Sequence, residues 1–81
     1  MSYNLIPGMQ FTYIGQEAYT NCVYEIMMID GETIRAVPAN EEAIEEASPS
    51  GKHNRYLPLF LDELKAGTTI ILGTNNQVRE L

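Results

Sequence analysis

Four side chains near the middle of the chain combine positive charge with an aromatic ring. They are Lys52, His53, Arg55 and Tyr56. Cationic side chains form charge-assisted hydrogen bonds to phosphate and carboxylate groups, and an aromatic ring offers a face for stacking. The cluster therefore indicates a candidate site for an anionic small ligand such as a nucleotide. The same residues also fit a mobile loop with ordinary solubilising charges, and the sequence leaves both interpretations open.

A second group of charged residues forms an acidic patch. Its members are Glu41, Glu42, Glu45 and Glu46. They lack the alternating Asp, Asn and Gly spacing of a calcium loop, so we interpret the patch as a solvated acidic face, with imitation of phosphate groups as the alternative. His53 is the only histidine and Cys22 the only thiol, so the chain has no zinc-type ligand set. The sequence predicts neither a metal nor a cofactor.

No residue pattern indicates catalysis. Asp62 and Glu63 are adjacent carboxylates at the start of an expected helical turn, where a capping role explains them better than general acid–base work. Gly67 and Gly73 bracket an expected strand, so they do not form a phosphate-binding loop. A domain of this size rarely encloses a substrate-sized pocket. We therefore expect a protein that is not an enzyme.

The net charge limits the classes of partner. The chain has 11 acidic and 5 basic residues, for a formal charge of −6. This balance disfavours direct binding to a phosphate backbone, which needs clustered Lys and Arg, and it suits a partner with a basic surface. A single cysteine fits a reducing cytosol, and residues 1–21 lack the pattern of a signal peptide. We expect a cytoplasmic protein with no membrane segment.

The chain is organised around an expected β-hairpin at Cys22–Val37 with its turn at Asp30-Gly31. A three-residue bulged turn gives one nearly apolar face, whereas a two-residue turn at Asp30-Gly31 mixes charge and hydrocarbon on both faces. The bulged turn places Glu25 opposite Arg35. The expected core face then consists of Tyr24, Ile26, Met28, Ile34 and Ala36, and we expect Cys22 to be buried as well.

The other face of this hairpin is a candidate partner-binding surface. It carries the apolar side chains Val23, Met27 and Val37 around the expected Glu25–Arg35 pair. These residues either pack within the same small barrel or contact a partner. Tyr19, in the polar loop 15–21, is a further candidate contact, because an exposed tyrosine offers large contact area at low entropic cost. The alternative places Tyr19 back on the rim of the barrel.

The remaining elements follow from local signals. Residues 1–8 form an arm, 39–54 a variable insert and 74–81 a polar tail. In the insert, Asn40 is an N-cap for a short helix at 41–47. The other expected elements are strands at Met9–Ile14, Arg55–Leu61 and Thr68–Leu72, and a helical turn at 61–66 that ends at Gly67. Pro58 within the Arg55–Leu61 run indicates an edge strand.

This order of elements resembles an SH3-like barrel in its architecture, with five short strands and a helical turn before the last one. The alternative is an OB-like barrel, because a helix between the third and fourth strands would match residues 40–47. We expect one all-β or β-rich domain over residues 1–81.

The functional expectation is a small acidic binding module that docks on a protein partner and inhibits or adapts it. Its size and acidity suit a protein encoded by a phage or mobile element. One alternative is a homo-oligomer that sequesters an anionic small ligand between its subunits, since a domain of 81 residues gains stability from association. The other alternative is a structural subunit of a larger assembly.

Overall fold

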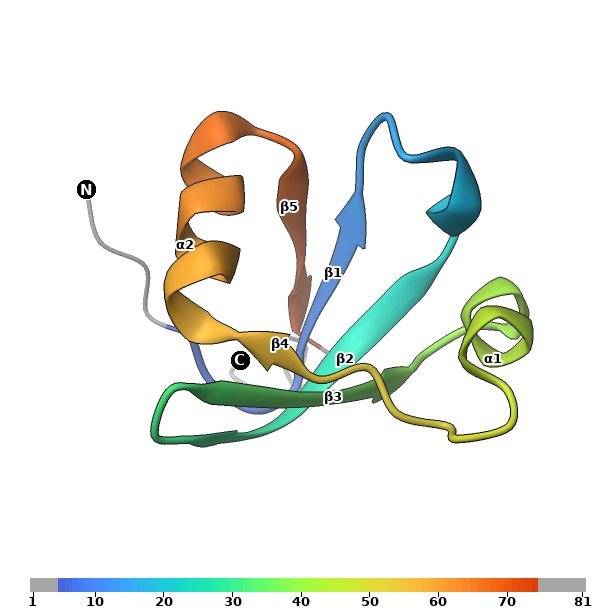
Figure 1. Ribbon diagram of the computed structural model, residues 1–81, viewed down its shortest axis with the longest axis horizontal. Coiled ribbons are helices and arrows are strands. Elements are labelled where there is room, and N and C mark those ends of the chain that lie inside the picture. Colours follow the sequence, from blue (N-terminus) through green and yellow to red (C-terminus); the bar gives the residue numbers. More distant parts are fainter. Residues whose placement is uncertain (1–4, 75–81) are drawn as a thin grey trace, which may run out of the picture.

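The computed structural model describes residues 5–74 and shows a curled antiparallel sheet of five strands with two α-helices (Figure 1). The strand order is β4-β3-β2-β1-β5. The strands are β1 (Met9–Tyr13), β2 (Val23–Asp30), β3 (Thr33–Pro38), β4 (Arg55–Tyr56) and β5 (Thr69–Thr74). The helices are the 3₁₀ turn η1 (Glu17–Tyr19), α1 (Glu41–Ala47) and α2 (Leu57–Ala66). The sheet curls into a half-barrel, and the expected β-rich class is confirmed.

Helix α2 spans the open side of the half-barrel, between the edge strands β4 and β5 (Figure 1). Phe60 and Leu64 lie one turn apart on its inner face, and both are buried. Pro58 occupies the first turn, where its missing N–H leaves no hydrogen bond unmade. Gly67 ends the helix in the left-handed conformation, with φ of 82°. The helix thus covers sheet edges that would otherwise present unpaired backbone groups.

The strand predicted for Arg55–Leu61 is wrong beyond Tyr56, because the chain turns helical at Leu57. The alternation of Leu57, Leu59 and Leu61 suggested a strand. However, the buried positions follow the helical spacing of Phe60 and Leu64, and Leu59 is half exposed. The helical turn predicted at 61–66 is the second half of α2, and its end at Gly67 is confirmed.

The hairpin is present, but its turn differs from the prediction. Asp30 pairs with Thr33, so the loop has two residues, Gly31 and Glu32. Gly31 has φ of 62° while Glu32 has a negative φ, which is the pattern of a type II′ turn. The irregularity lies further along, between Ile26 and Met28, where Met27 has no partner on β3. The bulge therefore lies within the strand rather than at the turn.

This bulge changes the face of every side chain that follows it. Tyr24, Ile26, Ile34 and Ala36 are buried as predicted. Met28 is half exposed, so its place on the core face was wrong, and Ile29 packs against the core instead.

The predicted Glu25–Arg35 pair is also wrong. Glu25 lies opposite Val37, and Arg35 lies opposite Met28. The Arg35 guanidinium instead contacts the Asp30 carboxylate at 3.3 Å.

Aromatic rings dominate the core. Phe11 lies at its centre, with its ring stacked on Tyr24 at 5.7 Å and edge-on to Phe60 at 4.9 Å between centroids. Edge-to-face and offset arrangements of this kind stabilise beyond their area burial. The other buried members of the cluster are Tyr13, Cys22, Ile26, Ile34, Ala36, Ala43 and Leu64. The inward direction of Phe11 and Tyr13 and the burial of Cys22 are confirmed.

Helix α1 has the predicted bounds and the predicted cap. The Asn40 side-chain oxygen accepts hydrogen bonds from the backbone N–H groups of Ala43 at 3.0 Å and Val23 at 3.1 Å. The Asn40 amide also donates to the carbonyl of Asn21 at 2.7 Å. One side chain therefore caps the helix and ties it to the start of β2.

Two predictions lie partly outside the described residues. Of the arm at 1–8, the structure describes residues 5–8, and Leu5 packs against the core. Of the tail at 74–81, it describes only Thr74, as the end of β5. Within the described part of the chain, no helix has the length and apolar character that crossing a membrane requires.

Candidate functional site

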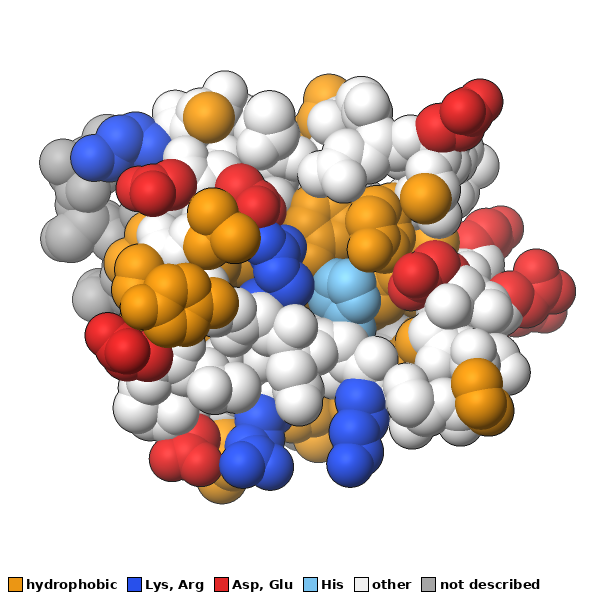
Figure 2. Space-filling view, in the orientation of Figure 1, with side chains coloured by type: hydrophobic (Ala, Val, Ile, Leu, Met, Phe, Trp, Pro, Cys, Tyr) orange, Lys and Arg blue, Asp and Glu red, His pale blue; other side chains and the backbone are white. Residues whose placement is uncertain are grey.

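A pocket of about 220 Å³ opens on the concave side of the half-barrel (Figure 2). Its lining comes from distant parts of the chain and consists of Tyr13, Gln16, Tyr19, His53, Arg55 and Glu63. Figure 2 shows a histidine and a basic side chain next to each other in a hollow near the middle of this face, bordered by side chains of the hydrophobic class. The pocket is therefore both aromatic and polar.

An ion pair forms one wall of this pocket. Arg55 Nη2 donates to Glu63 Oε2 at 2.6 Å, and the two side chains are 14% and 22% exposed. The second carboxylate oxygen of Glu63 accepts from the Thr69 hydroxyl at 2.9 Å. Arg55 Nη1 donates to the Tyr13 hydroxyl oxygen at 2.6 Å. The pair thus connects β4, α2, β5 and β1 in one hydrogen-bonded network.

His53 continues this network. Its Nε2 lies 2.5 Å from the Tyr13 hydroxyl oxygen. Because Arg55 donates to that oxygen, the hydroxyl hydrogen is left for His53 Nε2, which accepts it in the neutral Nδ1–H tautomer. The His53 ring stacks on Tyr24, with centroids 3.9 Å apart and planes at 15°. The Tyr24 hydroxyl in turn donates a hydrogen bond to the Glu46 carboxylate at 2.6 Å.

Burial favours the uncharged forms of these side chains. It raises the pKa of Tyr13 to about 12, against the opposing effect of the Arg55 charge and hydrogen bond. Burial also raises the pKa of Tyr24, and the hydrogen bond to Glu46 raises it further. Burial lowers the pKa of His53, the Arg55 charge lowers it further and the Glu46 carboxylate opposes both. His53 is therefore neutral at pH 7.

The ion pair shows the opposite behaviour, since each partner keeps the other charged. Burial alone would raise the pKa of Glu63, but the hydrogen bonds from Arg55 and Thr69 outweigh it and the pKa is lowered. Burial alone would lower the pKa of Arg55, but the hydrogen bond to Glu63 and the contacts with Tyr13 raise it. The six lining side chains then carry one positive and one negative charge at pH 7.

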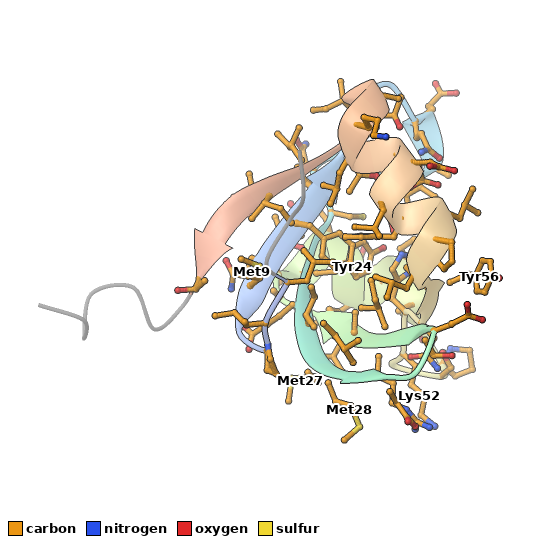
Figure 3. The ribbon with its side chains drawn as sticks, turned by 90° about the vertical axis from the view of Figure 1, so that its left-hand side faces the viewer. Met9, Tyr24, Met27, Met28, Lys52 and Tyr56 are labelled. Atoms are coloured by element: carbon orange, nitrogen blue, oxygen red, sulfur yellow. The ribbon has the colours of Figure 1, made fainter. Side chains whose placement is uncertain are left out.

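The predicted anionic-ligand cluster is divided by the fold. His53 and Arg55 line the pocket, but Lys52 and Tyr56 do not. Lys52 is exposed and Tyr56 is 56% exposed. Figure 3 shows both of these side chains on the outside of the ribbon. The four residues do not converge on one point.

The acidic patch lies along α1. Glu42, Glu45 and Glu46 border a shallow hollow that also includes Glu17 and Cys22, while Glu41 is exposed in the first turn of the helix. Glu46 accepts the hydrogen bond from Tyr24. Within residues 5–74, no group of three or more His, Cys, Asp or Glu side chains could hold a metal ion.

The predicted partner surface lies on the outer face of the sheet. Met27 and Met28 are about half exposed there, and Figure 3 shows them pointing away from the side on which Tyr24 lies. Val23 and Val37 are partly buried in the same face, and Glu25 accepts a hydrogen bond from Gln10 at 3.3 Å.

Two rows of paired residues continue this face across the sheet. They run Ile70–Thr12–Val23 and Gln10–Glu25–Val37. Paired residues of antiparallel strands share a face. Ile70 of β5 is therefore an outer-face residue too, and it is exposed. Leu72 lies two positions further along β5, at the register shift between β5 and β1, and is also exposed.

Tyr19 lies elsewhere, on the rim of the pocket. Its ring centroid is 4.9 Å from that of Tyr13 and 5.6 Å from that of His53. Sequence reasoning did not identify Gln16, Tyr13 or Glu63 as site residues. It assigned Tyr13 to the core and Glu63 to a helix start, and no local pattern joins residues that are 40 or more positions apart, as Tyr13 is from His53.

Comparison of this chain with protein-family models, with curated proteins and with solved structures finds no match. The two regions with the geometry of a binding site are the pocket and the outer face of the sheet.

Proposed function

We propose that this protein is a small acidic, non-enzymatic binding module of the cytoplasm. It docks on a partner protein through the outer face of its sheet and inhibits or adapts that partner. A protein encoded by a phage or mobile element would suit this role. The observation that carries the proposal is the apolar character of an exposed sheet face.

The outer face has more hydrocarbon than a solvated sheet needs. Met27, Met28 and Leu72 are each about half exposed, and Ile70 is 38% exposed. Ala43 of α1 and Phe60 and Leu64 of α2 are buried in the inner core, on the other side of the sheet from this face. Exposed apolar side chains gathered on one face of a small protein commonly mark an interaction site.

The charge of the protein supports a partner with a basic surface. The formal charge is −6, and the turn at the end of the outer face carries Asp30 and Glu32. A partner surface with an apolar centre and a border of Lys and Arg would complement it. Such complementarity raises the association rate and is weakened by salt.

We propose an SH3-like identity for the fold. The pairing of β1 through β4 in chain order, the return of β5 to β1 and the helix before β5 support it. Helix α1, between β3 and β4, is the feature that the OB-like alternative shares. The ligand-sequestering and structural-subunit interpretations have no specific observation in their favour within residues 5–74.

Affinity capture with two matched variants tests the docking surface. Met27→Asp introduces a charge on the outer face, and Leu59→Asp does so on α2, at sites with 52% and 51% exposure. The partner is identified by mass spectrometry, purified, and titrated against each variant by calorimetry. We expect Met27→Asp to weaken binding at least tenfold, and Leu59→Asp to leave it unchanged, because only the first buries an unpaired charge in the interface.

Equal binding by both variants would show that the outer face is not the docking surface. Circular dichroism of each variant controls for unfolding. An assay of the partner's own activity, with and without the protein, then separates inhibition from adaptation.

A further inference from the structure

We propose that the pocket of Tyr13, Gln16, Tyr19, His53, Arg55 and Glu63 binds a neutral, planar heteroaromatic compound, such as a free nucleobase. The pocket lies on the concave side of the half-barrel, away from the outer face to which the docking proposal refers. The two sites are independent, so either can fail without the other.

The size of the pocket limits its occupant to one or two rings. Its volume is about 220 Å³. Pockets for drug-sized ligands hold about 300–1,000 Å³, so this pocket accepts a smaller molecule or the ring system of a larger one.

An anionic ligand is disfavoured by the way in which Arg55 is held. Its guanidinium already donates to the Glu63 carboxylate at 2.6 Å and to the Tyr13 hydroxyl at 2.6 Å. A phosphate or carboxylate beside Arg55 would therefore also lie beside Glu63, where like charges repel. His53 adds no positive charge at pH 7, because burial lowers its pKa. The single cation of the pocket thus offers little net attraction for an anion.

A cationic ligand is disfavoured for a similar reason. Aromatic rings attract cations to their faces, but the Arg55 guanidinium itself lies 5.4 Å from the Tyr13 centroid and 5.6 Å from the Phe60 centroid. The carboxylate that would attract a cation, Glu63, is paired with the same Arg55. A second cation would meet a charge that is already balanced.

The groups that remain available suit a polar ring. Tyr19 offers an aromatic side chain on the rim, half buried and in contact with Tyr13 and His53. Within residues 5–74, neither the Tyr19 hydroxyl nor the Gln16 side-chain amide has a hydrogen-bond partner. The amide both donates and accepts, as does the hydroxyl. A planar heterocycle with a donor and an acceptor on its edge could stack on the ring and pair with these groups.

The direct test is a titration of the ¹⁵N-labelled protein, followed by its backbone amide shifts. Adenine is the first probe. Adenosine and adenosine monophosphate form a matched pair that differs only in the phosphate, and phenyltrimethylammonium is the cationic probe. We expect adenine and adenosine to shift the amides around Gln16, Tyr19 and His53, adenosine monophosphate to bind no more tightly than adenosine, and the cation to bind more weakly than adenine.

Three variants assign the binding to the pocket. Tyr19→Leu removes the stacking ring, and we expect at least a fivefold loss of adenine affinity. Gln16→Leu removes the amide from an exposed loop position, so folding is unaffected, and we expect roughly a three- to tenfold loss. Tyr56→Leu removes an exposed tyrosine outside the pocket and serves as the matched control, with no change in affinity expected.

Four results would overturn the proposal. They are no binding of adenine up to its solubility limit, tighter binding of the monophosphate than of adenosine, tighter binding of the cation than of adenine, and equal affinity of the wild-type protein and the Gln16→Leu variant. None of these results bears on capture of a protein by the outer face. The Met27→Asp variant, in turn, should bind adenine as the wild-type protein does.

Discussion

The guanidinium of Arg55 and the carboxylate of Glu63 meet at 2.6 Å and join β4 to α2 across the open side of the half-barrel. Both side chains are mostly withdrawn from water, and Thr69 and Tyr13 satisfy further hydrogen-bonding groups of the pair. The contact therefore holds the helix that covers the sheet edges, and it also forms a wall of the pocket.

Replacing Arg55 should destabilise the fold strongly. Arg55→Met leaves the Glu63 carboxylate without its partner in a poorly solvated site, and we expect the free energy of unfolding to fall by about 2–4 kcal/mol. Urea denaturation measures it. Arg35→Met is the matched control: the Arg35 and Asp30 side chains are 55% and 62% exposed, so its loss should stay below about 1 kcal/mol. Equal losses would contradict the structural role of the Arg55–Glu63 pair.

His53 should make stability dependent on pH in the weakly acidic range. Burial lowers its pKa in the folded state from the ordinary 6.5, so the unfolded chain binds the proton more readily. The His53 contribution is therefore complete above pH 6.5 and is lost as the pH falls from there through the folded-state pKa. Melting temperatures between pH 8 and pH 5 measure it, and the His53→Gln variant should show a shallower slope. An unchanged slope in that variant would assign the effect to other groups.

Tyr13 should produce the corresponding effect in alkali. Its pKa is raised from 10 to about 12 by burial, so the folded state keeps the hydroxyl protonated after the unfolded chain has lost it. Stability should then fall as the pH rises from about 10 to 12. Tyr13→Phe should reduce this dependence, and the part that remains comes from Tyr24, whose pKa burial also raises. The substitution also leaves an Arg55 donor unpaired, for a loss of about 1–3 kcal/mol at pH 7. Urea denaturation at pH 7 and pH 10.5 separates the two effects.

Replacing Asn40 should lower the free energy of unfolding more than the loss of an ordinary helix cap does. Asn40→Ala removes three hydrogen bonds, to Ala43, Val23 and Asn21. A lost N-cap usually costs about 0.5–2 kcal/mol, and the additional bonds should bring the loss to about 2–3 kcal/mol. Asn54→Ala, at an exposed position before β4, is the control and should cost less than about 0.5 kcal/mol. Chemical denaturation of both variants compares them.

The sequence could predict those elements whose signals are local. Helix α1 begins after Asn40 and ends at Ala47 as predicted, because its cap and its stop lie within a few residues of it. The same holds for β1, and for Gly67 at the end of α2. Pro58 indicated an edge strand, but it lies in the first turn of α2. A proline fits either position.

The pocket and the hairpin register could not be predicted in this way. Arg55 and Tyr13 are 42 residues apart, and only the tertiary structure brings them together. The three-residue turn was predicted because it gives one nearly apolar face and pairs Glu25 with Arg35. In the structure, Arg35 instead forms an ion pair with Asp30, and the irregularity lies at Met27. Interactions of a few tenths of a kcal/mol between exposed charges are too weak to determine a register.

Because of the bulge at Met27, strand β2 could lose one residue without a change in the register of its other residues. Removing this one residue would leave Ile26 opposite Ala36 and Met28 opposite Arg35 in an uninterrupted ladder, with inward and outward side chains alternating as they do now. Deletion of a residue from the regular part of β2 would instead reverse the faces of its neighbours. A related chain that is one residue shorter here could therefore keep the same core.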